Sequence, residues 1–302
     1  MIDTITDLAE IRRRSSCGNI DPRRLELYLA LARFAPGRLA QFVNERGYFL
    51  LCRATTTMAG NPSTAVEHFF VYRLDTDTPA QAPVALDDVN DLLGAVAGER
   101  PNVWLSFDNL APNVHAHDNA DSWYNVLPVA GRTYDAYVEA LGSDRRRALA
   151  KALDLTRGAR EDRYTEPAAI AAEIERRVRA HCHARYGGNS LLEGALTREE
   201  ILLAVDIFPT ELRIFTSEAD YGFVLACLIE GALYVVLVGG TTPFMCKRAY
   251  HSLIREAFDS DGRIRAVDAG STSPFLKRQL GFEPHRFHAV LKGDPVWTHY
   301  VF

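Results

Sequence analysis

Chemically reactive side chains gather near the end of the chain, between Val267 and Phe282. Asp268 ends an apolar run that predicts a buried strand, and Gly270 with the Ser-Thr-Ser residues after it predicts a turn whose backbone a ligand can approach closely. A short helix follows, and Lys277 falls on it about two helical turns further on. A carboxylate at a strand end and an ammonium on the next helix can face one crevice, and we place the chemistry there.

A second candidate is a glycine-rich turn that precedes a helix expected over 244–258. The turn consists of Gly239, Gly240, Thr241 and Thr242. A helix N-terminus presents unpaired N–H groups to an anion, so the turn could receive the phosphate of a cofactor. The alternative is a helix cap without a ligand.

One segment of the chain is densely basic. It contains Arg145, Arg146, Arg147 and Lys151, followed by Arg157, Arg160 and Arg163. Arginine makes bidentate contacts with phosphate, which favours a substrate-binding role. The alternative is a solvated helix face whose charge is countered by Asp144, Asp154 and Glu161.

The elements that must hold these residues alternate between strands and helices. Apolar runs bounded by turn residues predict strands over 212–216, 222–229, 233–238, 263–268 and 285–291. Strands 233–238 and 263–268 are expected to splay apart at one end, because the glycine pair lies at the split. Tyr234 stands on a strand that flanks this split, so it is the best aromatic candidate for a pocket wall.

The rest of the chain also mixes helices and strands. Helices are expected over 23–34, 38–46, 86–97, 133–141, 143–155, 167–183 and 197–207, and strands over 48–54, 66–74, 102–107 and 123–129. We place a domain boundary near residue 130, which divides the chain into 1–130 and 131–302.

This order of elements resembles the GNAT acyltransferase fold, specifically its FemAB-like branch, over most of 124–292. The segments that carry the resemblance are 134–137, 143–147, 268–270 and 276–282. It implies an α/β (α+β) fold in which a mixed, mostly antiparallel sheet is flanked by helices. It also implies two such units in tandem: a degenerate N-terminal one over 1–130 and an acyltransferase-like one over 131–302.

The resemblance also implies roles for particular residues. The lysine that matches Lys277 lies in the acceptor cleft of Fem-type transferases and stabilises charge during acyl transfer, with Asp268 beside it. The turn 239–242 matches the region where GNAT enzymes receive the pyrophosphate of acyl-CoA. The substrate-facing residues are expected to be Tyr234, Arg145, Arg146 and Phe275. Two departures stand out: Leu276 occupies the usual aromatic position, and the Arg/Gln-x-x-Gly-x-Gly/Ala signature for CoA is missing.

The resulting hypothesis is a transferase that moves an acyl or aminoacyl group from a thioester or ester to an amine of a small molecule or peptide. Acyl-CoA and aminoacyl-tRNA are the candidate co-substrates, tRNA is a candidate partner, and neither DNA nor a tightly bound cofactor is expected. Fem-type relatives use aminoacyl-tRNA, which requires no CoA signature. The alternative is a GNAT-fold binding protein that has lost catalysis.

Composition limits the other classes. A net charge of −5 argues against a general polyanion binder, and no apolar run approaches the length of a membrane span. Five scattered cysteines favour reduced thiols and a cytoplasmic location. His115 and His117, like His181 and His183, lack further converging ligands, so no metal is expected.

Overall fold

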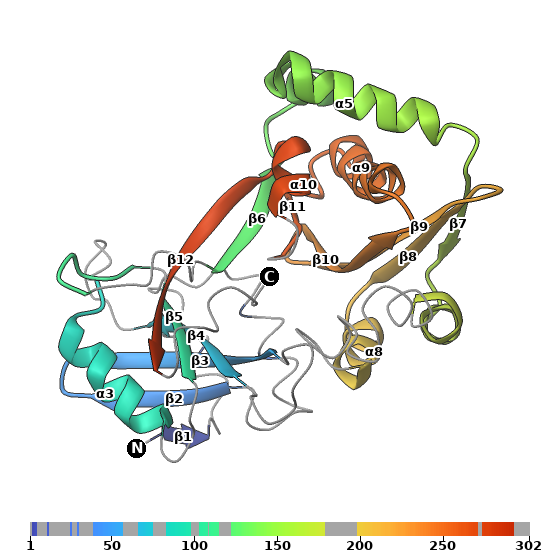
Figure 1. The fold of residues 1–302 in the computed structure, drawn as a ribbon. Helices are drawn as coiled ribbons and strands as arrows, with labels where there is room; N and C mark the ends of the chain where they lie inside the picture. The colour runs from blue at the N-terminus through green and yellow to red at the C-terminus, as the bar shows by residue number, and fades with distance from the viewer. Residues whose placement is uncertain are drawn as a thin grey trace. The chain divides into compact units, whose positions relative to one another are not determined.

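The computed structural model describes residues 2–4, 11, 25, 29, 39–56, 66–74, 83–97, 103–107, 109–114, 122–178, 198–270 and 274–292. They belong to two compact units, each assembled from separate stretches of the chain (Figure 1). Unit 1 comprises 1–122, 188–200 and 286–302, and unit 2 comprises 123–187 and 201–285.

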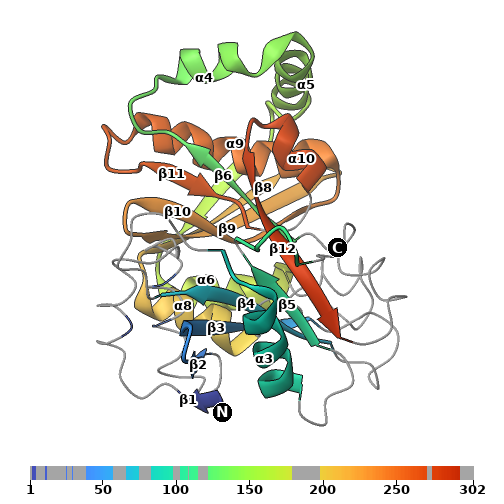
Figure 2. The ribbon, with the colours of Figure 1, turned by 90° about the vertical axis from the view of Figure 1, so that its left-hand side faces the viewer.

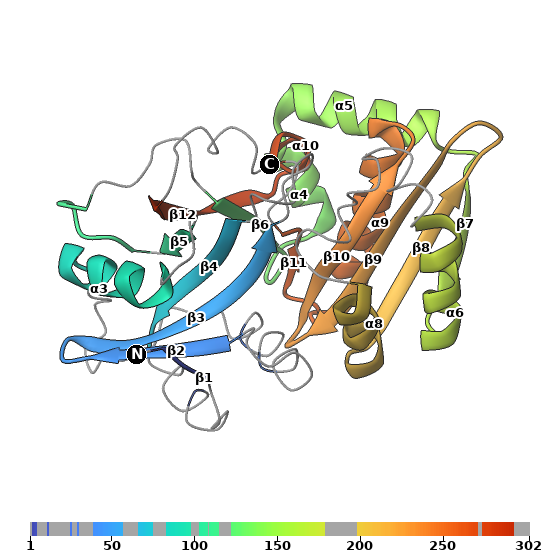
Figure 3. The same ribbon diagram turned by 60° about the horizontal axis from the view of Figure 1, so that its bottom comes forward.

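Unit 1 contains a mostly antiparallel sheet (Figure 3). Its strands are β1 (Ile2–Thr4), β2 (Leu39–Asn44), β3 (Gly47–Thr56), β4 (Val66–Arg73), β5 (Val103–Phe107) and the second half of β12 (Glu283–Lys292), in that order. Among the described strand pairs of the unit 1 sheet, only β4 and β5 run parallel. Helix α3 (Leu86–Ala97) buries Val89, Leu92 and Val96 in the same core as Leu51 and Val71 of the sheet.

The helix expected over 38–46 is wrong, because Leu39–Asn44 is strand β2. Leu39 and Phe42 are both buried and three residues apart, a spacing that fits a helix face as well. Pairing decides the outcome: β2 forms a hairpin with β3, in which Phe42 lies opposite Phe49 with ring centroids 6.2 Å apart.

Unit 2 contains the sheet that carries the predicted site (Figure 2). Its strands lie in the order β6 (Ser122–Pro128), β11 (Ala266–Asp268), β10 (Ala232–Gly240), β9 (Tyr221–Ile229), β8 (Thr210–Thr216) and β7 (Arg160–Tyr164). In this unit 2 sheet the pair β10–β11 is parallel, and the other described pairs are antiparallel. The helices are α4 (Tyr134–Ala140), α5 (Gly142–Leu155), α6 (Pro167–Glu173) with a π-helical turn Ile174–Val178, α8 (Arg198–Ile207), α9 (Pro243–Asp259) and α10 (Pro274–Gln279).

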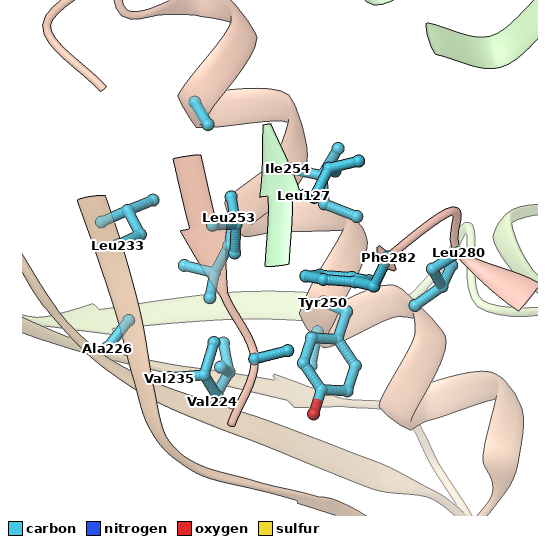
Figure 4. Packing of buried hydrophobic residues seen from close by; sticks show 14 of the residues in the cluster. Leu127, Val224, Ala226, Leu233, Val235, Tyr250, Leu253, Ile254, Leu280 and Phe282 are labelled. Atoms are coloured by element: carbon cyan, nitrogen blue, oxygen red, sulfur yellow. The ribbon is translucent and has the colours of Figure 1, made fainter. Parts of the chain in front are cut away.

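Helix α9 packs on this sheet and contributes more residues to its core than any other described helix. Thr242 caps its first turn by accepting from the N–H of Met245 at 3.3 Å, and Pro243 occupies the first helical position. Tyr250, Leu253 and Ile254 then recur on the face that packs against the strands (Figure 4).

The predicted fold class is therefore confirmed: the chain is α+β, with two mostly antiparallel sheets flanked by helices. Strand β7 was not predicted, because its sequence is highly charged. Along this strand Arg160 pairs with Asp162, and Arg163 pairs with Glu161. The helix expected over 167–183 is described only to Val178, where its last turn widens to π-helix.

Candidate functional site

The site begins where β10 and β11 part. The two strands pair only from Ala232 opposite Ala266 to Tyr234 opposite Asp268, whereas β10 continues beside β9 to Gly240. The β10–β9 register shifts between Val235 and Leu237, at the start of this divergence. Beyond Tyr234, the edge of β10 that faces away from β9 has no strand partner in the described chain, so the predicted splay is confirmed.

A turn anchored by four hydrogen bonds follows β11. Gly270 has φ of +68°, a left-handed conformation that favours glycine, and its N–H donates to Oδ1 of Asp268 at 2.9 Å. The carbonyl of Gly270 accepts from three donors: the N–H of Asn125 at 3.1 Å, Nδ2 of Asn125 at 3.0 Å and Nζ of Lys277 at 3.1 Å. The turn is therefore held from both β6 and α10.

Lys277 differs from the expectation of a lysine exposed in a cleft. Its side chain is 0% exposed and that of Asp268 is 2% exposed. The ammonium is thus buried against the Gly270 carbonyl, where solvent screens its charge little. Sequence reasoning missed Asn125, which is fully buried; the available signal was a single amide among the apolar residues of its strand.

The spacing of Lys277, Gly281 and Phe282 in the sequence is explained by the hydrogen bonds that end helix α10. The N–H of Phe282 donates to the carbonyl of Lys277 at 3.1 Å, and the N–H of Gly281 donates to that of Arg278 at 3.1 Å. With φ of +79° at Gly281, these bonds form a Schellman motif, in which the glycine reverses the chain and the next apolar residue packs. Phe282 is buried accordingly, 5.8 Å from the ring of Tyr250.

Two sequence segments that carried the resemblance meet at this helix end. The hydroxyl of Tyr137, on α4, donates to the carbonyl of Leu280 at 3.0 Å, and both residues are buried. A Cβ built on Gly281 would lie 2.8 Å from Cδ2 of Leu141 and 3.3 Å from Cε2 of Tyr137. Helix α4 thus fits the glycine of the Schellman motif closely.

Gly239 and Gly240 belong to strand β10 rather than to the expected open turn. Gly240 lies opposite Gly222, and a Cβ on it would lie 3.1 Å from both Sγ of Cys246 and Cβ of Met245. The glycine therefore lets the start of α9 pack on the strand. Thr241 and Thr242 remain in the turn; Thr241 is exposed and donates to Asp220 at 2.8 Å.

The expected substrate residues lie at separate places in unit 2. Tyr234 is half-buried at the last β10–β11 pair, and Phe275 is 70% exposed on α10. Arg145 and Arg146 are exposed on α5 and make no ion pair with any described residue, whereas Arg157 pairs with Asp154 at 2.7 Å. Of the predicted catalytic and substrate residues, the structure brings Asp268, Lys277 and Tyr234 to the point where the strands diverge.

His251 and Tyr134 form a partly buried polar contact between α9 and α4. Nε2 of His251 lies 2.6 Å from the hydroxyl of Tyr134, and the guanidinium of Arg255 lies 4.3 Å from the centre of the tyrosine ring. Burial, together with the charges of Arg248 and Arg255, lowers the pKa of His251 to about 4. Folding therefore favours the neutral imidazole.

This contact predicts a pH-dependent stability. Because the folded pKa of His251 lies below the unfolded value of about 6.5, its penalty is absent above pH 6.5 and grows as the pH falls toward 4. The free energy of unfolding should decrease by about 3 kcal/mol over that interval through this group. Urea unfolding from pH 7 to pH 4 measures it. His251→Gln, which keeps a hydrogen-bonding side chain but does not titrate, should lose less stability; equal slopes for both proteins would contradict the assignment.

The residues that the structure describes do not support metal-dependent or thiol-based catalysis. These residues contain no group of three histidine, cysteine or acidic side chains that could hold a metal ion. His115, His117, His181 and His183 lie outside them. Burial raises the pKa of the Cys227 thiol to about 11, which disfavours a thiolate nucleophile. No described helix combines the length and apolar character needed to span a bilayer.

Comparison with known proteins identifies the class of fold. No protein-family model and no curated protein matches the sequence. The C-terminal domain of a proposed lysylphosphatidylglycerol synthetase from Agrobacterium fabrum superposes with a TM-score of 0.53 at 11% identity, over 97% of this chain and 95% of that chain. A conserved protein of unknown function from Bacteroides thetaiotaomicron gives 0.53 at 11% identity over 96% and 99%. FemX gives 0.50 at 11% identity over 95% and 96%.

At this identity the likeness establishes the fold. The chain has a GNAT-like fold of the FemAB-like kind, as the resemblance predicted. The parallel pair β10–β11 that diverges after three residues is the feature of this fold on which the candidate site depends.

Proposed function

We propose that this protein is an N-acyltransferase that moves an aminoacyl group from an activated ester to an amine of a small molecule or peptide. The observation that carries the proposal is the divergence of β10 and β11 beside the anchored Gly270 turn. An unpaired strand edge offers N–H and C=O groups to an extended ligand. Two reactants held on this edge would react directly, because fixing their orientation removes much of the barrier.

Lys277 and Asp268 support this chemistry by holding the Gly270 turn in place. Their hydrogen bonds hold the two sides of Gly270, so we assign both as positioning residues. The buried ammonium also adds a positive potential where the carbonyl oxygen becomes negative during transfer.

An aminoacyl-tRNA donor is favoured over acyl-CoA by two observations. Gly240 is packed against Met245 and Cys246, so the glycine pair does not provide an open phosphate cradle. Arg145 and Arg146, in contrast, are exposed on α5 without acidic partners among the described residues and are available to phosphate. The solved structure from Agrobacterium fabrum bears the name of an enzyme that forms an aminoacylated product, which is consistent with such a donor.

Charge reversal on α5 tests the donor. The double substitution Arg145→Glu and Arg146→Glu should weaken binding of total aminoacylated tRNA by about 10- to 100-fold and flatten the plot of log affinity against log salt by about 1.5–2, because fewer counterions are released. Filter binding at several salt concentrations measures both. Arg157→Glu is the matched control, since Arg157 is exposed but already paired with Asp154.

The competing donor gives a different result. If acyl-CoA is the donor, titration calorimetry should detect acetyl-CoA binding that the double substitution leaves unchanged, and tRNA should not bind. Failure of both ligands to bind would instead favour a GNAT-fold binding protein without transferase activity.

A further inference from the structure

The hydroxyl of Tyr250 is a buried polar group without a partner in the described part of the chain. Tyr250 is 0% exposed on α9, and its Oη makes no hydrogen bond there. A buried hydroxyl left unpaired is unfavourable, and phenylalanine would fill the same space without that penalty. Packing alone therefore does not account for a tyrosine at this position.

Tyr250 packs beside the strand that ends at the candidate site. Figure 4 shows the Tyr250 ring beside Phe282, with its oxygen pointing away from the labelled apolar side chains. Helix α9 packs against β11, and Tyr250 shares one hydrophobic core with Val267 and Ala269, the two chain neighbours of Asp268. Burial raises the pKa of the Tyr250 hydroxyl, and the charges of Cys246 and Asp268 raise it further, so the phenol remains protonated.

A second unpaired atom lies at the Gly270 turn itself. Oδ1 of Asn125 is buried and has no hydrogen-bond partner in the described chain, while Nδ2 of the same amide binds the Gly270 carbonyl. One unpaired polar atom at this turn and a second on the helix that packs against β11 favour a polar ligand in the site.

We propose that Tyr250 is a catalytic residue whose hydroxyl donates a hydrogen bond to the carbonyl oxygen of the acyl group being transferred; this rests on the proposed function. A protonated phenol suits a carbonyl, which only accepts, better than it suits a protonated amine, which only donates. The amine nitrogen forms a bond to the carbonyl carbon, and the carbonyl electron pair moves onto oxygen. Tyr250 stabilises this oxyanion without giving up its proton. When the carbonyl re-forms, the ester C–O bond breaks, and the leaving oxygen takes the proton that the amine loses.

Tyr250→Phe and Tyr137→Phe provide a matched comparison of two buried tyrosines. The hydroxyl of Tyr137 binds Leu280, so Tyr137→Phe should lower the melting temperature, whereas Tyr250→Phe should leave it unchanged or raise it. An equal fall in both variants would show that the Tyr250 hydroxyl has a structural partner, and would overturn the proposal.

The ligand arm uses total tRNA that ends in 3′-amino-3′-deoxyadenosine, charged with all twenty amino acids as stable amides, and the same pool uncharged. Wild type should bind the charged pool about tenfold more tightly, and Tyr250→Phe should bind both pools with the affinity that wild type has for the uncharged one. If Tyr250→Phe still binds the charged pool more tightly than the uncharged one, the role of Tyr250 is overturned, but the proposed function is not. If wild type binds neither pool, the donor assigned under the proposed function is wrong and the role of Tyr250 toward it falls as well.

Discussion

Replacing Gly281 by alanine is expected to lower the free energy of unfolding by about 2–4 kcal/mol. Its φ of +79° is unfavourable for any residue with a Cβ, and the new Cβ would lie 2.8 Å from Cδ2 of Leu141. Leu141 is only 5% exposed, so it cannot move aside into solvent. Urea unfolding followed by circular dichroism measures the loss.

Gly262 separates backbone strain from the clash. It has the same φ of +79°, but a Cβ built on it meets nothing within 4 Å. Gly262→Ala should therefore lose no more than about 1–2 kcal/mol, from strain alone. If the two substitutions are equally destabilising, the close fit of α4 against Gly281 does not contribute to stability.

Replacing Lys277 by methionine is expected to reduce turnover by about 10²-fold while the affinity for the donor stays close to that of wild type. Methionine preserves most of the apolar stem but removes the ammonium that binds the Gly270 carbonyl at 3.1 Å. Single-turnover transfer from aminoacylated tRNA, combined with a separate binding measurement, distinguishes the two effects.

The stability of the Lys277 variants follows from the burial of the side chain. In Lys277→Met the lost hydrogen bond and the relieved desolvation of the charge oppose each other, so the melting temperature should change little. Lys277→Ala leaves a cavity as well and should lose about 2–5 kcal/mol. Arg278→Met, at the exposed neighbouring position on α10, is the control and should match wild type in both assays. Full turnover in Lys277→Met would remove the ammonium from the mechanism.

Local sequence determined several elements of unit 2 and the turn that ends α10. Alternating apolar runs located β8, β9 and β10, and Thr242 with Pro243 marked the start of α9. The spacing from Lys277 to Gly281 and Phe282 is that of a Schellman motif, whose hydrogen bonds span only six residues. Such features depend on neighbours in the chain, so they can be read from the sequence.

The segments that failed prediction are those whose pairing overrides their local pattern. Leu39–Asn44 has apolar residues at a helical spacing, and pairing with β3 makes it a strand. Gly239 and Gly240 read as a turn, but pairing with β9 extends the strand through them and α9 packs against them. The predicted domain boundary near residue 130 and the tandem arrangement of two GNAT-like units stay predictions.

The residue types at the candidate site were visible in the sequence, since Asp268, Gly270 and Lys277 lie within one short segment. Only the tertiary structure decided what these residues contact. It buries Lys277 against the Gly270 carbonyl and brings Asn125 to the same carbonyl from a strand far away in sequence. It also leaves the hydroxyl of Tyr250 without a partner in the described chain. Burial and long-range pairing depend on how α9, α10 and β6 pack together, which local spacing does not encode.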